Sequence, residues 1–105
     1  MTVLDWISVH RHGAPPALVE RTLTVLRETG ESANADVCDA LLAASDALLR
    51  RVLVDRAPGE ARTAALDLLA ADACVTWAFE AAADAPATLA ARAEAAMRRI
   101  TEAAA

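Results

Sequence analysis

Apolar residues recur along this chain at helical spacing in five successive segments. In each, large apolar side chains repeat every three to four residues, which places them on one side of an α-helix. Glycine and proline lie between the segments, as is typical of helix ends. The pattern predicts helices over residues 2–12, 15–29, 60–83 and 86–102, and a helix that begins after a cap at Ser32 or Asn34 and ends near Arg56.

The first segment, residues 2–12, also fits an alternating strand pattern. As a helix it places Val3, Trp6, Ile7 and His10 on one side. A lone strand has no neighbour for its backbone hydrogen bonds, and no other segment of this chain has a strand pattern. We therefore expect a short helix with Thr2 as its N-cap.

The third predicted helix has an apolar side that covers nearly half its circumference. Asp36 and Asp39 fall in its first turns, and Arg50 and Arg51 near its end, as the helix dipole favours. The apolar side comprises Val37, Cys38, Leu41, Leu42, Leu48, Leu49, Val52 and Leu53. A side this wide predicts contact with at least two other helices.

The fourth predicted helix carries two stripes of large residues, roughly 150° apart at about 100° per residue. One stripe is Leu68, Val75 and Phe79; the other is Leu66, Leu69, Ala73 and Trp77. A helix that is apolar on two sides is normally central, with neighbours on both. Asp72 lies between the stripes, where a charge is hardest to place.

The fifth predicted helix has one stripe, formed by Leu89, Ala93, Ala96, Met97 and Ile100. The connections are a few residues long, and short links between long helices favour antiparallel neighbours. We therefore predict a single all-α domain over residues 1–105. Its architecture is a four-helix antiparallel bundle with a short additional N-terminal helix.

Composition narrows the range of partners. The chain is 56% hydrophobic and 24% charged, which is typical of a globular protein, and its net charge is −5. An acidic protein is a poor partner for nucleic acid or an anionic membrane, so we expect neither. No uncharged stretch reaches the roughly 18 residues that span a bilayer. We expect a cytoplasmic protein with no bound cofactor.

The hairpin of the third and fourth helices suggests a possible ligand site. A turn centred near Pro58 places Asp72 level with Ser45, within the apolar side of the third helix. A buried carboxylate needs a hydrogen-bond or charge partner, so one interpretation is a cavity lined by Asp72, Ser45 and Phe79. The alternative has Asp72 at the surface and Ser45 bonded to the carbonyl of Leu41.

The cysteines and histidines do not form a recognisable site. Cys38 and Cys74 miss each other by about 7 Å along the hairpin, so we expect free, buried thiols and no bridge. His10 and His12 would point about 200° apart on a helix and could not share a metal. We predict no metal site.

The second stripe of the fourth helix raises the possibility of an interface. If the bundle leaves it uncovered, Trp77 with Leu66, Leu69 and Ala73 forms an apolar patch, with Trp6 as a further candidate. Exposed patches of this kind usually mark protein contacts. In the alternative, the first or second helix covers Trp77.

Three functions follow from these features. We expect a small non-enzymatic helical protein that acts through protein–protein contacts, as a homo-oligomer or with another protein. The alternative is a ligand-binding or enzymatic bundle around Asp72, Ser45 and Phe79. A helix-turn-helix module formed by the first two helices is disfavoured by the acidic balance and the few basic residues on the second helix.

Overall fold

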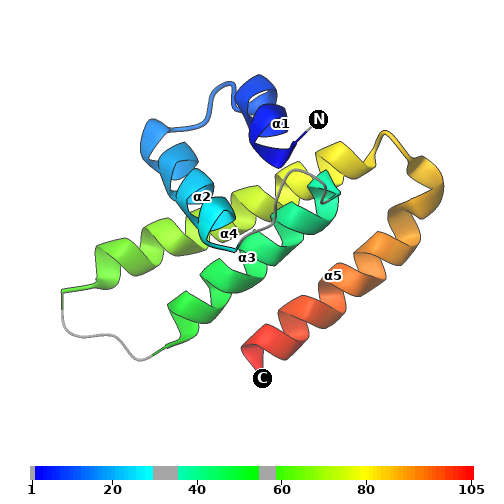
Figure 1. Cartoon of the computed structure of the whole chain (residues 1–105). Coiled ribbons are helices and arrows are strands. Elements are labelled where there is room, and N and C mark those ends of the chain that lie inside the picture. Colours follow the sequence, from blue (N-terminus) through cyan, green and yellow to red (C-terminus); the bar gives the residue numbers. More distant parts are fainter. Residues whose placement is uncertain (1, 30–35, 55–58) are drawn as a thin grey trace.

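The computed structural model describes residues 2–29, 36–54 and 59–105. In these residues the backbone forms five α-helices, one turn of 3₁₀ helix and no strand, so the predicted all-α class is confirmed (Figure 1). The elements in order are α1 Val3–His10, α2 Pro16–Glu28, α3 Val37–Leu53, α4 Ala61–Ala82, η1 Pro86–Thr88 and α5 Leu89–Ala104.

The ends of α1 and α2 are set by local sequence. Thr2 is the N-cap of α1, as predicted: its hydroxyl accepts from the Asp5 N–H at 3.1 Å, and the Asp5 carboxylate accepts from the Thr2 N–H at 3.2 Å. This reciprocal capping box satisfies two backbone donors. Gly13, with φ of 80°, adopts a backbone conformation that favours glycine, and Pro16 then occupies the first turn of α2.

The start of α3 differs from the prediction. The proposed caps, Ser32 and Asn34, lie outside the described residues. The N-cap is Asp36, whose carboxylate accepts from the Asp39 N–H at 3.1 Å. Aspartate is as good an N-cap as serine or asparagine, so three candidates within five residues could not be ranked by propensity.

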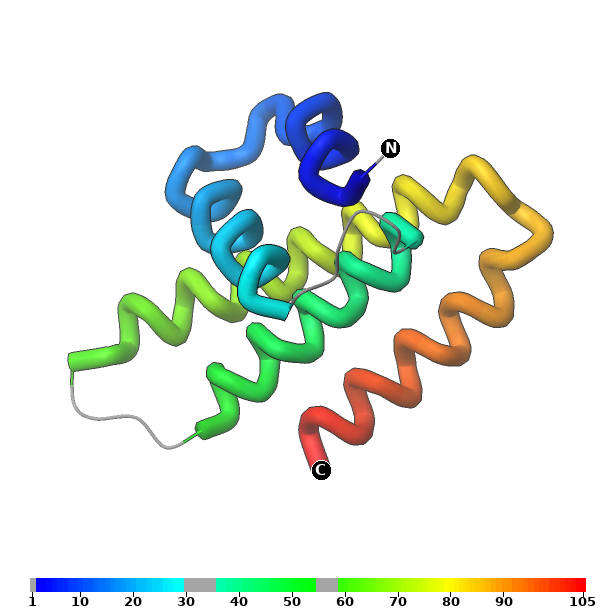
Figure 2. Tube along the Cα trace, in the orientation of Figure 1, coloured from blue at the N-terminus to red at the C-terminus, as the bar shows by residue number. Residues whose placement is uncertain are grey.

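Helix α3 lies at the centre of the molecule and packs against α1, α2, α4 and α5. Its predicted apolar side is buried over most of its length; Leu41 and Leu48 are fully inaccessible. Helix α4 returns antiparallel beside it, α2 lies over both, and α1 lies over the end where α3 begins and α4 ends. Helix α5 runs along α3 and is separated from α2 by the hairpin (Figure 2).

The alignment of α3 with α4 agrees with the prediction to within one residue. The Ser45 hydroxyl donates to the carbonyl oxygen of Ala71, the neighbour of Asp72, at 3.1 Å. Both groups are buried, so this hydrogen bond fixes the two helices along their length. Alanines on both helices are fully inaccessible, among them Ala44, Ala70 and Ala78. Such small side chains let helix axes approach closely.

The predicted orientation of α4 is wrong. Its buried side is Asp67, Ala70, Ala71, Cys74, Trp77, Ala78 and Ala82. This side lies in the wide interval between the two stripes, so most of the large residues flank it: Leu68 is 51% exposed and Leu69 is 61% exposed. The two stripes are the edges of one broad face of α4. The side chains at the centre of this face are small, because the close approach of α3 leaves no room there for leucine.

Helix α5 begins with the turn η1, and its first α-helical residue is Leu89. Its predicted stripe is only partly buried. Ala96 and, further along the helix, Ala103 are buried, whereas Met97 is 69% exposed and Ile100 is 43% exposed. The two large side chains near the end of the helix therefore contribute little to the core.

Candidate functional site

Among residues 2–29, 36–54 and 59–105, the one buried charged side chain is that of Asp67, which is 1% exposed and lies where α4 meets α2. The guanidinium of Arg21, on α2, donates to its two carboxylate oxygens at 2.6 and 3.3 Å. Donation to Asp67 also raises the pKa of Arg21 above its usual value. A buried carboxylate needs such a partner, and the pair is a structural link between α2 and the hairpin.

The sequence interpretation missed this pair. Asp72 lies in the narrow interval between the two stripes of α4, whereas Asp67 lies in the wide interval. The sequence did contain a signal, because Asp67 is the one charged residue on a helical side otherwise made of alanine, cysteine and Trp77. Its partner could not be read from the sequence, since Arg21 is one of several arginines on other helices.

The structure does not bring Asp72 to Ser45. Asp72 is exposed, whereas Ser45 is buried and its hydroxyl is engaged with Ala71 in place of Leu41. Phe79 is half-buried and packs against the core. The predicted cavity around these three residues is therefore not formed, because the α4 side that carries Asp72 faces away from α3.

The predicted interface residues are divided between core and surface. Trp77 is 7% exposed and Trp6 is 5% exposed, so both belong to the hydrophobic core. Leu66 and Ala73 are half-buried, and Leu69 is exposed. Of the proposed patch, Leu69 alone presents most of its side chain to solvent.

The two cysteines are free and buried, as predicted. Burial raises the pKa of the Cys74 thiol to about 12, and it also raises the pKa of Cys38. Because the thiolate is the reactive form, both groups are poor nucleophiles at neutral pH. His10 stacks on Trp6 with ring centroids 3.8 Å apart, and its Nδ1 lies 2.8 Å from the Trp6 carbonyl oxygen.

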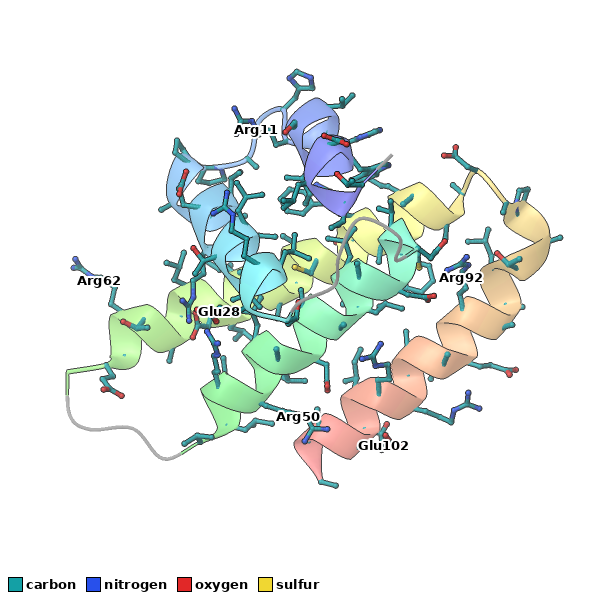
Figure 3. All side chains as sticks on the ribbon, in the orientation of Figure 1. Arg11, Glu28, Arg50, Arg62, Arg92 and Glu102 are labelled. Carbon is teal, nitrogen blue, oxygen red and sulfur yellow. The ribbon has the colours of Figure 1, made fainter. Side chains whose placement is uncertain are left out.

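The most polar constellation lies where α3 begins and α5 passes it. Arg92 points from α5 toward this end of α3 (Figure 3). Its guanidinium donates to both oxygens of Asp36, at 2.9 and 3.3 Å, and to Asp39 at 3.5 Å; its Nε donates to Thr88 at 3.0 Å. Donation from Arg92 lowers the pKa of Asp36.

Asp36, Cys38 and Asp39 could together hold a metal ion, since one ligand atom from each lies within 4.8 Å of the others. In the structure the guanidinium of Arg92 already supplies the positive charge for both carboxylates. The cluster is thus satisfied as an ion-pair network between α3 and α5, and a metal would have to displace Arg92.

These polar arrangements join helices to one another. Two arginine–aspartate networks join α2 and α5 to the central hairpin, and the thiols are held protonated. No helix in the described part of the chain is long and apolar enough to cross a membrane. Comparisons with protein-family models, with curated proteins and with solved structures give no match to this chain.

Proposed function

We propose that this is a small non-enzymatic helical protein that acts through protein–protein contacts and self-associates through α5. The observation that carries the proposal is the position of Met97, the most exposed of the large apolar residues on the described surface. It lies on a helix whose buried side chains are the alanines Ala96 and Ala103.

The largest apolar side chains in the second half of α5 are exposed, whereas two of its alanines are buried. Apolar burial contributes roughly 25 cal/mol per Å², so a buried alanine contributes far less than a buried methionine or isoleucine. Met97 and Ile100 lie side by side on the helix, three residues apart. A partner that covers them would recover the stabilisation that the monomer leaves unused.

Two exposed leucines on α4 are further candidates for contact with protein partners. Leu68 and Leu69 are both more than half exposed, and they lie on the two stripes that flank the buried side of the helix. Exposed apolar residues are individually common, so the proposal rests on α5. The free, buried thiols are also compatible with the cytoplasmic location that we propose, where disulfides are rare.

Size-exclusion chromatography with light scattering, at about 50 µM protein, tests the proposal. We expect a dimer for the unmodified chain and a monomer for the double variant Met97→Glu with Ile100→Glu, because burying two carboxylates at an apolar contact is unfavourable. Ala91→Glu, on an exposed position of the same helix, is the matched control and should remain a dimer. A monomeric unmodified chain at this concentration would contradict the proposal.

A further inference from the structure

A half-open pocket lies at the end of the hairpin that α1 covers. Its volume is about 270 Å³, which suits a small ligand. Trp6, Val37, Ala81, Ala82 and Ala85 form an apolar wall, and Asp36, Asp84 and Arg92 supply the charges. An apolar wall with a few charged groups is the usual form of a small-molecule site.

Two of the charged side chains of the pocket pair with each other, and the third does not. Arg92 and Asp36 neutralise each other through two hydrogen bonds, at 2.9 and 3.3 Å. Asp84, immediately beyond α4, has no ion pair or side-chain hydrogen bond within the described ranges 2–29, 36–54 and 59–105. The negative end of the α4 dipole lies beside Asp84 and the positive end of the α3 dipole lies at Asp36, so the two dipoles oppose each other in the pocket. Within the described ranges the carboxylate of Asp84 is the charge of the pocket that remains unpaired, and it favours a cation.

Trp6 adds a second feature that suits an organic cation. Trp6 is only 5% exposed, and yet it lines the pocket. Aromatic rings attract ammonium groups and also pack against their alkyl chains.

We propose that this pocket binds an organic ammonium group, whose charge pairs with Asp84 and whose alkyl part packs on Trp6 and the neighbouring alanines. The ligand class is a small alkylammonium compound or the side chain of a lysine, which share this chemistry. The inference is independent of self-association, because α5 contributes only Arg92 to the pocket and Met97 lies outside it.

Titration with n-butylammonium chloride, followed by the tryptophan indole signals in a nitrogen–proton correlation spectrum, tests the proposal. We expect the Trp6 signal to shift with a dissociation constant on the order of 1 mM, as is typical of a ligand with few atoms. Potassium chloride at equal concentration controls for ionic strength. Nα-acetyl-lysine amide as a second probe separates the two sources: binding by either probe supports the proposal and identifies the source.

Two comparisons make the test specific to Asp84. Asp84→Asn should weaken n-butylammonium binding about fivefold, in keeping with a solvent-accessible ion pair, whereas Asp72→Asn, on an exposed position of α4, should leave it unchanged. With the unmodified chain, 1-butanol should bind more weakly than n-butylammonium because it lacks the charge. An unmoved Trp6 signal with both ammonium probes, or equal binding by 1-butanol, would overturn the proposal.

Discussion

At the scale of single residues, the buried carboxylate of Asp67 has a large effect on stability for a short side chain. It is 1% exposed, and Arg21 reaches it at 2.6 Å from a side chain that is itself 24% exposed. Breaking a buried ion pair usually costs far more than the pair contributes relative to apolar residues, because a charge then remains in a poor environment. Asp67 and Arg21 should therefore be strongly coupled.

A double-mutant cycle measures this coupling. Arg21→Met should lower the free energy of unfolding by about 2 kcal/mol, because it removes the guanidinium from a buried carboxylate. Adding Asp67→Asn should restore part of that loss, since no buried charge then remains. Urea unfolding followed by circular dichroism gives the four free energies.

The matched control is Arg50→Met, which removes the surface pair of Arg50 with Asp46 on α3. We expect a change below about 0.5 kcal/mol, as for other exposed pairs one helical turn apart. Additive effects of Arg21→Met and Asp67→Asn would show that the two groups do not interact in solution.

Asp36 should make the free energy of unfolding depend on pH in the acidic range. Donation from Arg92 lowers its pKa in the folded protein from the ordinary value of 3.8. The stabilisation by the Asp36–Arg92 pair is therefore complete above the unfolded pKa of 3.8. It is lost as the pH falls through the lower pKa of the folded protein. Because its side chain is 46% exposed, we expect at most about 1 kcal/mol from this source.

Asp36→Asn isolates the charge, since asparagine keeps the N-cap acceptor of α3. The variant should be less stable than the unmodified chain at about pH 6, and the difference should be smaller at about pH 2, since Asp36 loses its charge as the pH falls through its lowered pKa. Denaturant midpoints at the two pH values give the comparison. A stability difference that stays constant across this range would contradict the role of the Arg92 pair.

At the scale of elements, the helices are joined through small side chains. The centre of the α4 contact surface is alanine and cysteine, and the Ser45 hydroxyl reaches the Ala71 carbonyl directly. Close packing of this kind leaves no space for an added methylene group. The hairpin should therefore be more sensitive to enlargement at its centre than to most changes at its edges.

Ala78→Leu tests this packing. Ala78 is fully inaccessible, so leucine there should separate α3 from α4 and lower the free energy of unfolding by about 2 kcal/mol. Ala65→Leu, at an exposed position of the same helix, should be nearly neutral because leucine and alanine have similar helix propensity. Thermal unfolding of both variants supplies the measurement, and equal midpoints would contradict the close contact.

At the scale of the whole molecule, α5 is the least integrated of the long helices. Ion pairs from Arg92 hold its beginning to α3, whereas in its second half Met97 is 69% exposed and Ile100 is 43% exposed. A dimer formed through α5 would be linked to folding by mass action. The apparent stability of the protein should then depend on its concentration.

The midpoint of thermal unfolding should rise by roughly 3 °C for each tenfold increase in protein concentration, given the unfolding entropy typical of a chain of this length. Scanning calorimetry over a hundredfold range provides the measurement. The double variant Met97→Glu with Ile100→Glu should show a midpoint independent of concentration. A concentration-independent midpoint in the unmodified chain would argue against a dimer.

Local interactions account for what could be predicted from the sequence. The all-α class, the existence of each helix, the Thr2 cap and the alignment of α3 with α4 depend on residues near one another in the chain or on the length of one turn. Apolar periodicity and capping are properties of single segments, so these features were accessible. Free, buried cysteines followed from the same hairpin alignment.

The rotation of α4 and the partners of the buried charges were decided by tertiary packing. Two leucine stripes suggested two covered sides, but the close approach of α3 selected the alanine side between them and left Leu68 and Leu69 at the surface. That choice buried Asp67 beside Arg21, exposed Asp72 and enclosed Trp77. The sequence by itself determined the helices; which side of each became the core depended on how closely their neighbours could approach.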